Sequence, residues 1–519
     1  MDYEELYKKE HLRSADLAGR VAELEAKVDD LQFRLDRIKT NPLWKATKPA
    51  RVCMHFVIRN VRRIKNQGSV RGVIHKIAYK KREKEAMRCF GTASFPDDEE
   101  RGKEESAAFP KMPLISILVP LYNTPEDFLR EMIDSVLAQT YKNWELCLAD
   151  GSDDAHPEVG SVVSEYIEKD KTANGTSRII YKKLSGNKGI SGNTNECLAI
   201  STGDYIGLFD HDDILHPSVL YEYVKAINEQ GADYLYCDET TFRSGSIDHM
   251  LTMHFKPDYA IDNLRANNYI CHFSVFARSL LDGTELFRPQ FDGSQDHDMI
   301  LRLTDRAQKI VHIPRLMYYW RCHKGSTASN IEAKPYAIEA ARGAVADHLV
   351  RHGYEHFRIT STRAFETIFK ISYEIIGTPK ISIVIPNKDH FEDLSRCIRS
   401  VTEKSTYDNY EIIVVENNST SEKIFEYYRQ LEENNKITVV TYKNEGNPAD
   451  NGDKEGFNYA KVNNFGVKYA TGDYVLLLNN DIEVITVNWM EELLMYAQRE
   501  DVACVGAKLL YPDRTIQHA

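Results

Sequence analysis

The sequence contains no apolar run that approaches the ~20 residues needed for a membrane-spanning helix. Its first residues, MDYEELYKKEHLR, include no apolar segment of the secretory type, so no signal peptide is expected. Basic residues are not in excess, because 66 Lys and Arg stand against 78 Asp and Glu, for a formal net charge of −12. This acidic balance argues against binding to nucleic acid.

Cysteine pairs are also missing. The nine cysteines of the 519-residue chain form no C-x-x-C pair, which excludes the common zinc patterns and indicates no disulfide framework. Reduced thiols in the cytoplasm are the expectation, with any membrane association peripheral, on the inner face of the cell membrane. A composition of 42% hydrophobic and 28% charged residues is that of globular domains, and the length allows about three of them.

Residues 1–40 are predicted to form one helix whose apolar residues are spaced alternately by four and three. The positions are Leu17, Val21, Leu24, Val28, Leu31, Leu35 and Ile38. This a/d pattern predicts a short coiled coil, and hence a homo-oligomer formed through 1–40. A single amphipathic helix packed on the rest of the protein is the alternative.

Residues 41–92 are basic, with fourteen Lys or Arg between Lys45 and Arg88 against Glu83 and Glu85. Apolar residues are interleaved, which predicts basic amphipathic helices that contact an anionic membrane surface. A solvated basic face, or a patch that meets the acidic remainder of the chain, is an equal alternative. Residues 93–112 are predicted to be an acidic linker.

The remainder of the chain contains an internal repeat. PLISILVPLYN, from Pro113, returns as PKISIVIPNKD, from Pro379. STGDYIGLFDHDD, from Ser201, returns as ATGDYVLLLNNDIE, from Ala470. Because the two separations are nearly equal, the chain carries two versions of one domain.

Each copy opens on a β-branched apolar run, ISILVP or ISIVIP, which predicts a buried strand. An amphipathic helix and a second apolar run, WELCLAD or YEIIVVEN, follow. Strands that alternate with helices predict an α/β domain with a mainly parallel, Rossmann-like sheet flanked by helices. Ligands of such sheets bind beyond the carboxyl ends of the strands, where Asn123, Asp150 and Asp210 fall. The domains are predicted at 113–375 and 376–519, the second as a partial copy.

The sharpest local signal is Asp210-His211-Asp212-Asp213, at the end of an apolar strand. Crowded carboxylates disfavour one another's ionisation unless a cation or hydrogen-bond donors compensate. Mg²⁺ or Mn²⁺, bound by one or two carboxylates and substrate phosphates, is a common solution. The alternative is an acidic turn in which Asp213 is the N-cap of the next helix.

The sequence resembles the bacterial family 2 glycosyltransferases, which have the GT-A fold, and within them the tandem-domain members that build O-antigen and cell-wall polysaccharides. The matching segments are 115–123, 148–154, 187–195, 203–213, 291–303 and 318–327. The resemblance implies a metal-dependent inverting hexosyltransferase. It also implies a TDP- or UDP-hexose donor and a saccharide or lipid-linked saccharide acceptor.

On the donor side, the resemblance places Pro120, Tyr122 and Asn123 after the first strand, near the nucleotide. It assigns Asp150 to binding of the nucleotide's base. The segment from Asn187 to Asn195 matches a loop and helix that approach the donor. The nucleotide-sugar residues implied by the resemblance are therefore Pro120, Tyr122, Asn123, Asp150, Lys188, Asn195, Asp210 and Arg321. Many members have arginine where this chain has Thr194.

The resemblance makes Asp210 and Asp212 the metal-binding pair, with His323 completing the metal shell and Arg321 neutralising the diphosphate. Asp296, in GSQDHD, matches the catalytic base, which takes the acceptor hydroxyl's proton. Asp298 is expected to support it. Helix capping is the alternative for both carboxylates. The acceptor candidates are Asn268, Tyr269 and His272.

In the second copy, Asn479 aligns with Asp210, Asp481 with Asp212, and Glu416 lies near the position of Asp150. The segment that should carry this copy's base does not appear before Ala519, so the second copy is predicted to bind nucleotide without catalysing transfer.

Two other functions stay open. A non-catalytic, transferase-like scaffold would bind nucleotide-sugar and organise partners. A sugar-nucleotide nucleotidyltransferase would need a Gly-rich loop after the first strand, where this chain has PLYNTPED.

Overall fold

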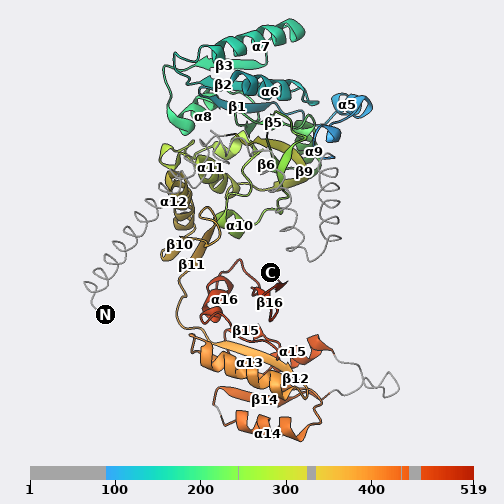
Figure 1. Ribbon diagram of the computed structural model, residues 1–519, viewed down its shortest axis with the longest axis vertical. Coiled ribbons are helices and arrows are strands. Elements are labelled where there is room, and N and C mark those ends of the chain that lie inside the picture. The colour runs from blue at the N-terminus through green and yellow to red at the C-terminus, as the bar shows by residue number, and fades with distance from the viewer. Residues whose placement is uncertain (1–88, 244, 324–334, 434, 444–457, 519) are drawn as a thin grey trace, which may run out of the picture. The chain divides into compact units, whose positions relative to one another are not determined.

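The computed structural model describes residues 89–243, 245–323, 335–433, 435–443 and 458–518 (Figure 1). The predicted heptad helix at 1–40 and nearly all of the basic segment at 41–92 lie outside these residues. Two compact units are present. In the smaller one, Thr92 donates from its backbone nitrogen to Asp248 Oδ1 over 2.8 Å. The larger unit contains both copies of the repeat.

The segment predicted as an acidic linker is not entirely a linker, because it contains helix α5, Asp98–Glu105. Asp97 accepts a hydrogen bond from the backbone nitrogen of Glu100 at 2.9 Å and so caps the helix. Three acidic residues in the first turn interact favourably with the positive end of the helix dipole and so stabilise the helix.

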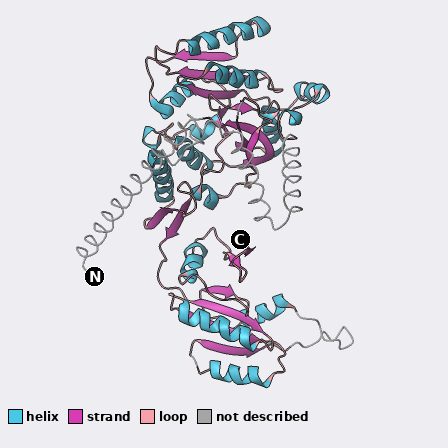
Figure 2. Cartoon of the chain, viewed as in Figure 1, coloured by secondary structure: helices cyan, strands magenta, loops and turns pink. Residues whose placement is uncertain are grey.

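The first copy begins with four parallel strands in the order β3-β2-β1-β4. These elements are β1 (Ile115–Leu121), α6 (Glu126–Leu137), β2 (Trp144–Asp150), α7 (Glu158–Asn174), β3 (Ile179–Lys183), α8 (Gly189–Ala199) and β4 (Tyr205–Leu208). Every residue of β1 and β2 is buried, as expected for central strands covered on both faces. Figure 2 shows the strands lying between helices.

The sheet of the first copy then continues as a mixed sheet through β8, β6, β9 and β5. The elements are β5 (Ile214–Leu215), α9 (Val219–Gln230), β6 (Tyr234–Phe242), β7 (Met250–His254), α10 (Ile261–Ala266), β8 (Val275–Ala277), η2 (Arg278–Leu281), η3 (Pro289–Phe291), α11 (Gln295–Thr304) and β9 (Ile310–Arg321). Helix α12 (Pro335–Arg351) and the antiparallel pair β10 (Phe357–Ser361) and β11 (Phe369–Tyr373) follow.

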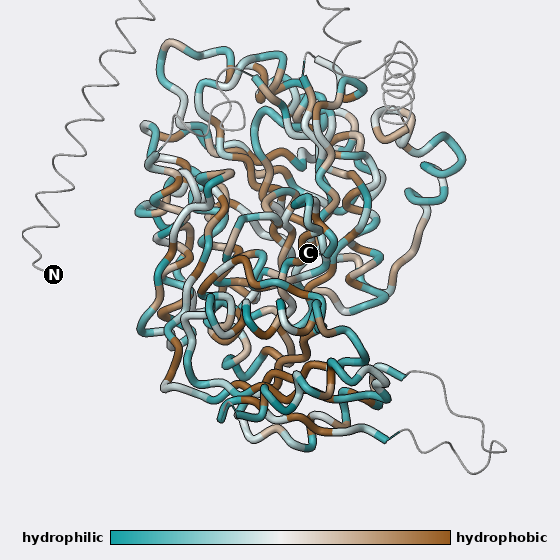
Figure 3. Tube along the Cα trace, turned by 60° about the horizontal axis from the view of Figure 1, so that its bottom comes forward, coloured by the Kyte–Doolittle hydropathy of each residue, from teal (hydrophilic) through white to brown (hydrophobic). Residues whose placement is uncertain are grey.

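The apolar core lies on both faces of this sheet. Along β1, Ile115 and Ile117 pack with Leu129 and Ile133 of α6, whereas Leu118 packs with Cys197 of α8 on the other face. This alternation follows from the two-residue period of a strand. In Figure 3 the hydrophobic stretches of the trace are bordered by hydrophilic loops.

The second copy repeats the first four strands in the same order, β14-β13-β12-β15, and also in parallel. Its elements are β12 (Ile381–Asn387), α13 (Phe391–Lys404), β13 (Tyr410–Glu416), α14 (Glu422–Leu431), β14 (Ile437–Thr441), α15 (Tyr459–Val467), β15 (Tyr474–Leu477), α16 (Trp489–Ala497), β16 (Leu509–Leu510) and β17 (Ile516–His518). Among the described residues, no helix is long and apolar enough to cross a membrane.

In each copy a glutamate of the second strand contacts the first strand and the segment that leads into the fourth; Glu145 is buried and Glu411 is partly buried. Glu145 accepts from Ser116 Oγ at 2.6 Å and from the backbone nitrogen of Thr202 at 2.5 Å. In the second copy, Glu411 accepts from Ser382 Oγ at 2.6 Å and from the backbone nitrogen of Thr471 at 2.8 Å. The same hydrogen bonds recur at equivalent positions. The two copies therefore share these contacts between the central strands as well as the order of the strands.

Glu145→Gln and Glu411→Gln are each expected to destabilise their own copy by about 1–3 kcal/mol, because buried donors lose a charged acceptor. In denaturant unfolding of the full chain at neutral pH, the two variants shift different transitions. The control Glu99→Gln, in an exposed pair with Lys103, shifts neither by more than ~0.5 kcal/mol. Unchanged unfolding transitions in both the Glu145 and the Glu411 variant would show that these glutamates do not stabilise their copies.

The same variants test a pH dependence. Burial opposes ionisation, but the hydrogen bonds outweigh it and hold the pKa of Glu145 below its usual value, and that of Glu411 at about 2. When the pKa of a carboxyl group is lower in the folded than in the unfolded state, ionisation of that group stabilises the folded protein. This contribution is complete above the unfolded pKa of ~4.3 and is lost as the pH falls through the folded pKa. The stability difference between wild type and each variant therefore shrinks in acid.

Candidate active site at the carboxyl edge of the first sheet

Asp150 is the last residue of β2 and its side chain is fully buried. It accepts from the backbone nitrogen of Ser152 at 2.8 Å, from Tyr181 Oη at 2.7 Å and from Lys183 Nζ at 3.0 Å. Burial alone would raise the pKa of Asp150, but these donors lower it. The carboxylate therefore positions Ser152 and Lys183. Its burial does not favour the direct contact with a base that the sequence resemblance implies.

The loop after β1 is fixed by Asn123. Its side-chain amide donates to Asp153 Oδ2 at 3.0 Å and accepts from the backbone nitrogen of Asp153 at 3.1 Å, and its φ of 46° lies in the left-handed region. Tyr122 is 45% exposed beside it and can meet a ligand. Pro120 does not follow the strand as predicted, because β1 runs to Leu121 and Pro120 is buried within it.

The predicted donor-side helix is α8. Lys188 directly precedes it, and its ammonium group pairs with Glu196. Asn195 uses both ends of its amide on the backbone of Phe287, at 2.9 and 3.0 Å. Asn195 therefore ties α8 to the segment before η3, and the donor contact predicted for it is not favoured by this geometry. Thr194 donates to the carbonyl of Ile190 at 2.8 Å within the helix.

Three carboxylates follow β4, as predicted, and ligand atoms of Asp210, Asp212 and Asp213 lie within 4.8 Å of one another. Asp213 is fully buried and accepts from Tyr318 Oη at 2.5 Å and from the backbone nitrogen of Arg321 at 2.7 Å. Burial, with the charges of Asp212 and Asp210, raises the pKa of Asp213 well above its usual value. Asp213 is not the helix N-cap that the alternative proposed, because β5 follows it and α9 begins only at Val219.

Asp210 and Asp212 are the partly exposed members of the group. His323 Nε2 lies 2.8 Å from Asp212 Oδ2, and His272 Nε2 lies 3.3 Å from Asp210 Oδ2. Two carboxylates and an imidazole from segments more than a hundred residues apart in the chain thus face one place. The carboxylate oxygens of this set suit Mg²⁺ or Mn²⁺.

Arg321 is 2% exposed, and its guanidinium lies near the rings of Phe128 and Phe242. Its Nε donates to the backbone carbonyl of Asp212 at 2.6 Å, and another nitrogen pairs with Glu131. The guanidinium therefore holds the 210–213 loop against α6 and β9. The diphosphate contact predicted for it is not favoured by this geometry.

His272 connects the acidic loop to the acceptor side. Its ring stacks on Tyr318, with centroids 5.0 Å apart and an interplanar angle of 16°. Burial alone would lower the pKa of His272, but Cys271 and Asp210 raise it well above its usual value. The neighbouring candidate Tyr269 is bound to backbone groups, accepting from the nitrogen of Ala260 at 2.9 Å.

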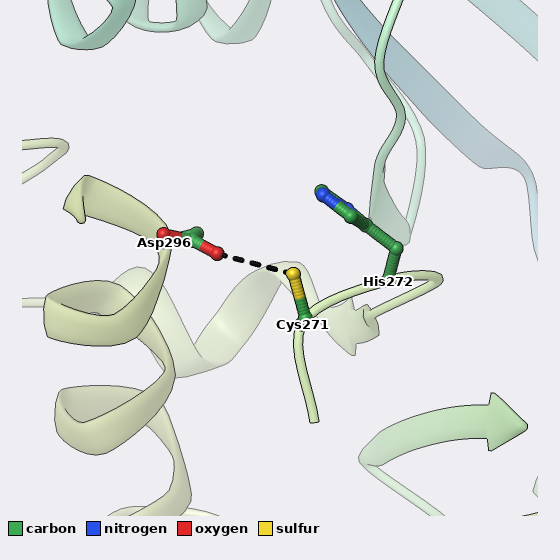
Figure 4. A group of neighbouring side chains, drawn as sticks. All are labelled: Cys271, His272 and Asp296. Carbon is green, nitrogen blue, oxygen red and sulfur yellow. Dashed lines mark hydrogen bonds between the residues drawn. The ribbon is translucent and has the colours of Figure 1, made fainter. Parts of the chain in front are cut away.

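Asp296 is in the first turn of α11. Its Oδ2 accepts from Asn268 Nδ2 at 2.7 Å and lies 3.5 Å from Cys271 Sγ (Figure 4). Ligand atoms of Cys271, His272 and Asp296 lie within 4.8 Å of one another. Because His272 also reaches Asp210, Asp296 lies on the same side of the sheet as the acidic loop.

Asp298 has a different environment from Asp296. It is 1% exposed and pairs with Arg288 and with Arg302, the latter at 2.9 Å. Asp298 therefore joins α11 to the segment before it, and its role in supporting the base stays a prediction. Neither carboxylate makes a capping bond with the helix backbone in the manner of the alternative.

In the second copy, Glu416 occupies the place of Asp150, because Asn387 pairs with Glu416 as Leu121 pairs with Asp150. It accepts from the nitrogen of Ser419 at 2.7 Å. The segment with Asn479 and Asp481 follows β15 as the acidic loop follows β4. Asn479 Oδ1 accepts from Tyr459 Oη at 3.0 Å.

Several residues of the site were not predicted from the sequence. Tyr318 and Glu131 hold the acidic loop, and Cys271 contacts Asp296. A local signal exists only for Cys271, which directly precedes His272 in the predicted acceptor segment. Tyr318 and Glu131 act through packing between distant segments.

Comparison with known proteins gives the class to which this site belongs. The model of glycosyl transferase family 2 matches residues 116–283 and 382–517, one segment in each copy and together more than half of the chain. The chain therefore belongs to glycosyltransferase family 2. The predicted family and the predicted α/β fold of GT-A type are thereby confirmed.

Two relatives cover most of this chain. An uncharacterized protein of Sinorhizobium fredii, y4gI, is 39% identical over 410 residues, 78% of this chain and 43% of that protein. The O-antigen biosynthesis protein RfbC of Myxococcus xanthus is 34% identical over 418 residues, 80% of this chain and 31% of that protein. The chain thus spans less than half the length of these relatives. The solved structure of S. aureus TarS matches with 18% identity and a TM-score of 0.35, covering 47% of this chain and 43% of that chain.

Arg321→Lys is expected to destabilise the first copy by about 1.5–3 kcal/mol, because lysine cannot reach both the Asp212 carbonyl and Glu131 from a buried position. Denaturant unfolding of the full chain measures the change. Arg315→Lys is the matched control, since Arg315 is 47% exposed in its pair with Glu222, and its effect stays within ~0.5 kcal/mol. Equal effects of the two variants would show that Arg321 does not hold the loop.

Proposed function

We propose that this protein is a metal-dependent inverting glycosyltransferase that moves a hexose from a nucleotide-sugar to a saccharide or lipid-linked saccharide acceptor in surface polysaccharide synthesis. Membership of glycosyltransferase family 2 supports the reaction class. The observation that carries the proposal is the continuous contact from Asp210 through His272 to the Cys271–Asp296 pair. It connects the acidic loop with a separate carboxylate, which supports the assignment of the first to the cation and of the second to the base.

In this mechanism, Asp296 takes the proton of the acceptor hydroxyl as its oxygen attacks the anomeric carbon of the donor. The bond from that carbon to the diphosphate oxygen breaks, and the nucleoside diphosphate leaves. Attack opposite the leaving group inverts the anomeric centre. Asp210, Asp212 and His323 would hold a divalent ion, which when bound would supply charge stabilisation for the diphosphate. Asn268 orients Asp296 through the 2.7 Å bond to Oδ2.

The remaining substrate and partner assignments are also proposals. A TDP- or UDP-hexose donor fits the family. Similarity to an O-antigen biosynthesis protein supports a polysaccharide acceptor, and transfer in the cytoplasm is part of the proposal. Membrane contact through 41–92 and self-association through 1–40 stay predictions, because both segments lie outside the described residues apart from 89–92.

Asp296→Asn is expected to lower transfer at least about 10²-fold while leaving donor binding intact, because the amide cannot take the proton. Nucleoside diphosphate release by the full chain, from a panel of nucleotide-sugars with acceptor, measures transfer, and calorimetry measures donor binding. Asp282→Asn, at an exposed loop position, is the control and retains activity.

Near-wild-type transfer by Asp296→Asn would overturn the assignment of the base. Residual transfer that Asp481→Asn removes would show that the second copy catalyses, contrary to the prediction. Donor binding without transfer by the wild type on every acceptor tested would support the scaffold alternative.

Asp212→Asn is expected to weaken Mn²⁺ binding by more than about tenfold, because the loop loses one of two partly exposed carboxylates. Titration of the full chain with Mn²⁺, followed by electron paramagnetic resonance, measures free ion directly and needs no substrate. Asp153→Asn, a carboxylate on the loop after β2, is the matched control. Unchanged Mn²⁺ affinity in Asp212→Asn would place the cation elsewhere.

A further inference from the structure

Beside the acidic loop, three side chains with three kinds of donor atom converge. Cys271 and His272 lie in the segment between α10 and β8, and Asp296 lies in the first turn of α11 (Figure 4). A sulfur, a ring nitrogen and a carboxylate oxygen from these residues are all within 4.8 Å of one another. Sulfur, imidazole and carboxylate are the ligands that Zn²⁺ takes in proteins.

His272 has a ring nitrogen without a partner. The residue is 8% exposed, and its Nδ1 is buried with no hydrogen-bond partner among the described residues, while Nε2 faces Asp210. A buried polar atom left unsatisfied is costly, so this ring nitrogen is available to bind a ligand.

The spacing of the other two ligands fits a metal ion. Bonds to Zn²⁺ of about 2.3 Å from sulfur and 2.0 Å from oxygen, at a tetrahedral angle, place the two ligand atoms about 3.5 Å apart. Cys271 Sγ and Asp296 Oδ2 are 3.5 Å apart. We propose that Cys271, His272 and Asp296 form a Zn²⁺ site with an open fourth position.

The charges around this site favour a cation. Asp210 contacts His272, and Glu239 lies close by, where it pairs with the buried Lys256 at 2.9 Å. Lys256 and His254 both pair with Glu239, which leaves the carboxylates of Asp210 and Asp296 to favour a cation at this site. Asn268, which donates to Asp296 Oδ2, holds the carboxylate in place as an outer partner.

A second group with metal-ligand spacing, Asp305, His348 and His352, lacks this balance. Arg351 lies 3.5 Å from Asp305 Oδ2, and Arg265 Nε donates to His348 Nε2 at 3.1 Å. Two guanidinium groups against one carboxylate disfavour a divalent cation. Nε2 of His348 is occupied by Arg265, and Nδ1 faces Asp305 at 3.2 Å. The Cys271 group is therefore the better metal site.

Zn²⁺ binding has a defined proton balance. A cysteine ligand binds Zn²⁺ as the thiolate, so one proton leaves the Cys271 thiol as the ion binds. The bound divalent ion stabilises that thiolate directly. The imidazole of His272 and the carboxylate of Asp296 bind through a nitrogen and an oxygen lone pair.

The consequence for transfer rests on the proposed function. A Zn²⁺ ion on Asp296 occupies the carboxylate that takes the acceptor's proton. Micromolar Zn²⁺ is then an inhibitor that acts on the base and is not relieved by excess Mn²⁺, whose site is the acidic loop.

The test is binding of Co²⁺ alone to the purified full chain, since a thiolate–Co²⁺ bond gives a strong near-ultraviolet absorption that oxygen and nitrogen ligands do not give. The wild type is expected to show this band, and Zn²⁺ to abolish it by displacement. Cys271→Ser is expected to lose the band and to weaken Zn²⁺ by more than the roughly 10–100-fold that an outer-shell loss costs. Cys322→Ser is the matched control, as the other partly buried cysteine of the described residues, and keeps the band.

A band that persists in Cys271→Ser, or disappears in Cys322→Ser, would place the metal at another thiol and overturn the site. Absence of any band in the wild type would do the same. Asp296→Asn guards against misfolding of the cysteine variant, because it keeps the thiol and is expected to weaken Co²⁺. The binding experiment uses no sugar substrate. A protein that binds Co²⁺ at Cys271 but never transfers sugar would refute the proposed function and leave the metal site standing.

Discussion

The structure of the site depends on how the first copy accommodates three carboxylates within four residues at the end of β4. Each has a different partner. Asp213 is buried against Tyr318 and the backbone of Arg321, Asp212 faces His323, and Asp210 faces His272. Without such partners the charges would repel one another and the loop would be unstable. Because the partners come from β9 and from the segment before β8, the loop takes this form only when the mixed part of the sheet has folded.

In the second copy, fewer charged residues follow the fourth strand, so the repulsion between neighbouring carboxylates is weaker there. Asn479 and Asn480 stand where the first copy has Asp210 and His211, and only Asp481 remains charged among them. Asn480 Nδ2 donates to Asn387 Oδ1 at 2.6 Å, which ties this loop to the first strand of its own sheet. The two amides thus satisfy one another between the loop and β12, a neutral contact where the first copy has charged carboxylates.

The sequence was informative wherever a local pattern determines the structure. The strands β1 and β12, the repeat, and the carboxylates after β4 follow from apolar periodicity and from the common edge of parallel strands. The functions of Arg321 and Asn195 could not be predicted in this way. Arg321 pairs with Glu131 and donates to the carbonyl of Asp212. Asn195 hydrogen-bonds to the backbone of Phe287. Contacts between segments far apart in the chain decide which hydrogen-bond donors are already occupied within the protein. The spacing of residues along the sequence does not show these contacts.

The motif around Asp296 illustrates how neighbouring carboxylates acquire separate roles. Asp298 lies between Arg288 and Arg302 and pairs with both. Asp296 instead contacts the amide of Asn268 and the thiol of Cys271, both through Oδ2. Removal of either partner of a buried ion pair is costly, so Asp298 fixes the position of the helix that carries both residues. Asp296 makes no ion pair with an arginine in these contacts, and this difference is the basis for the separate roles proposed for the two carboxylates.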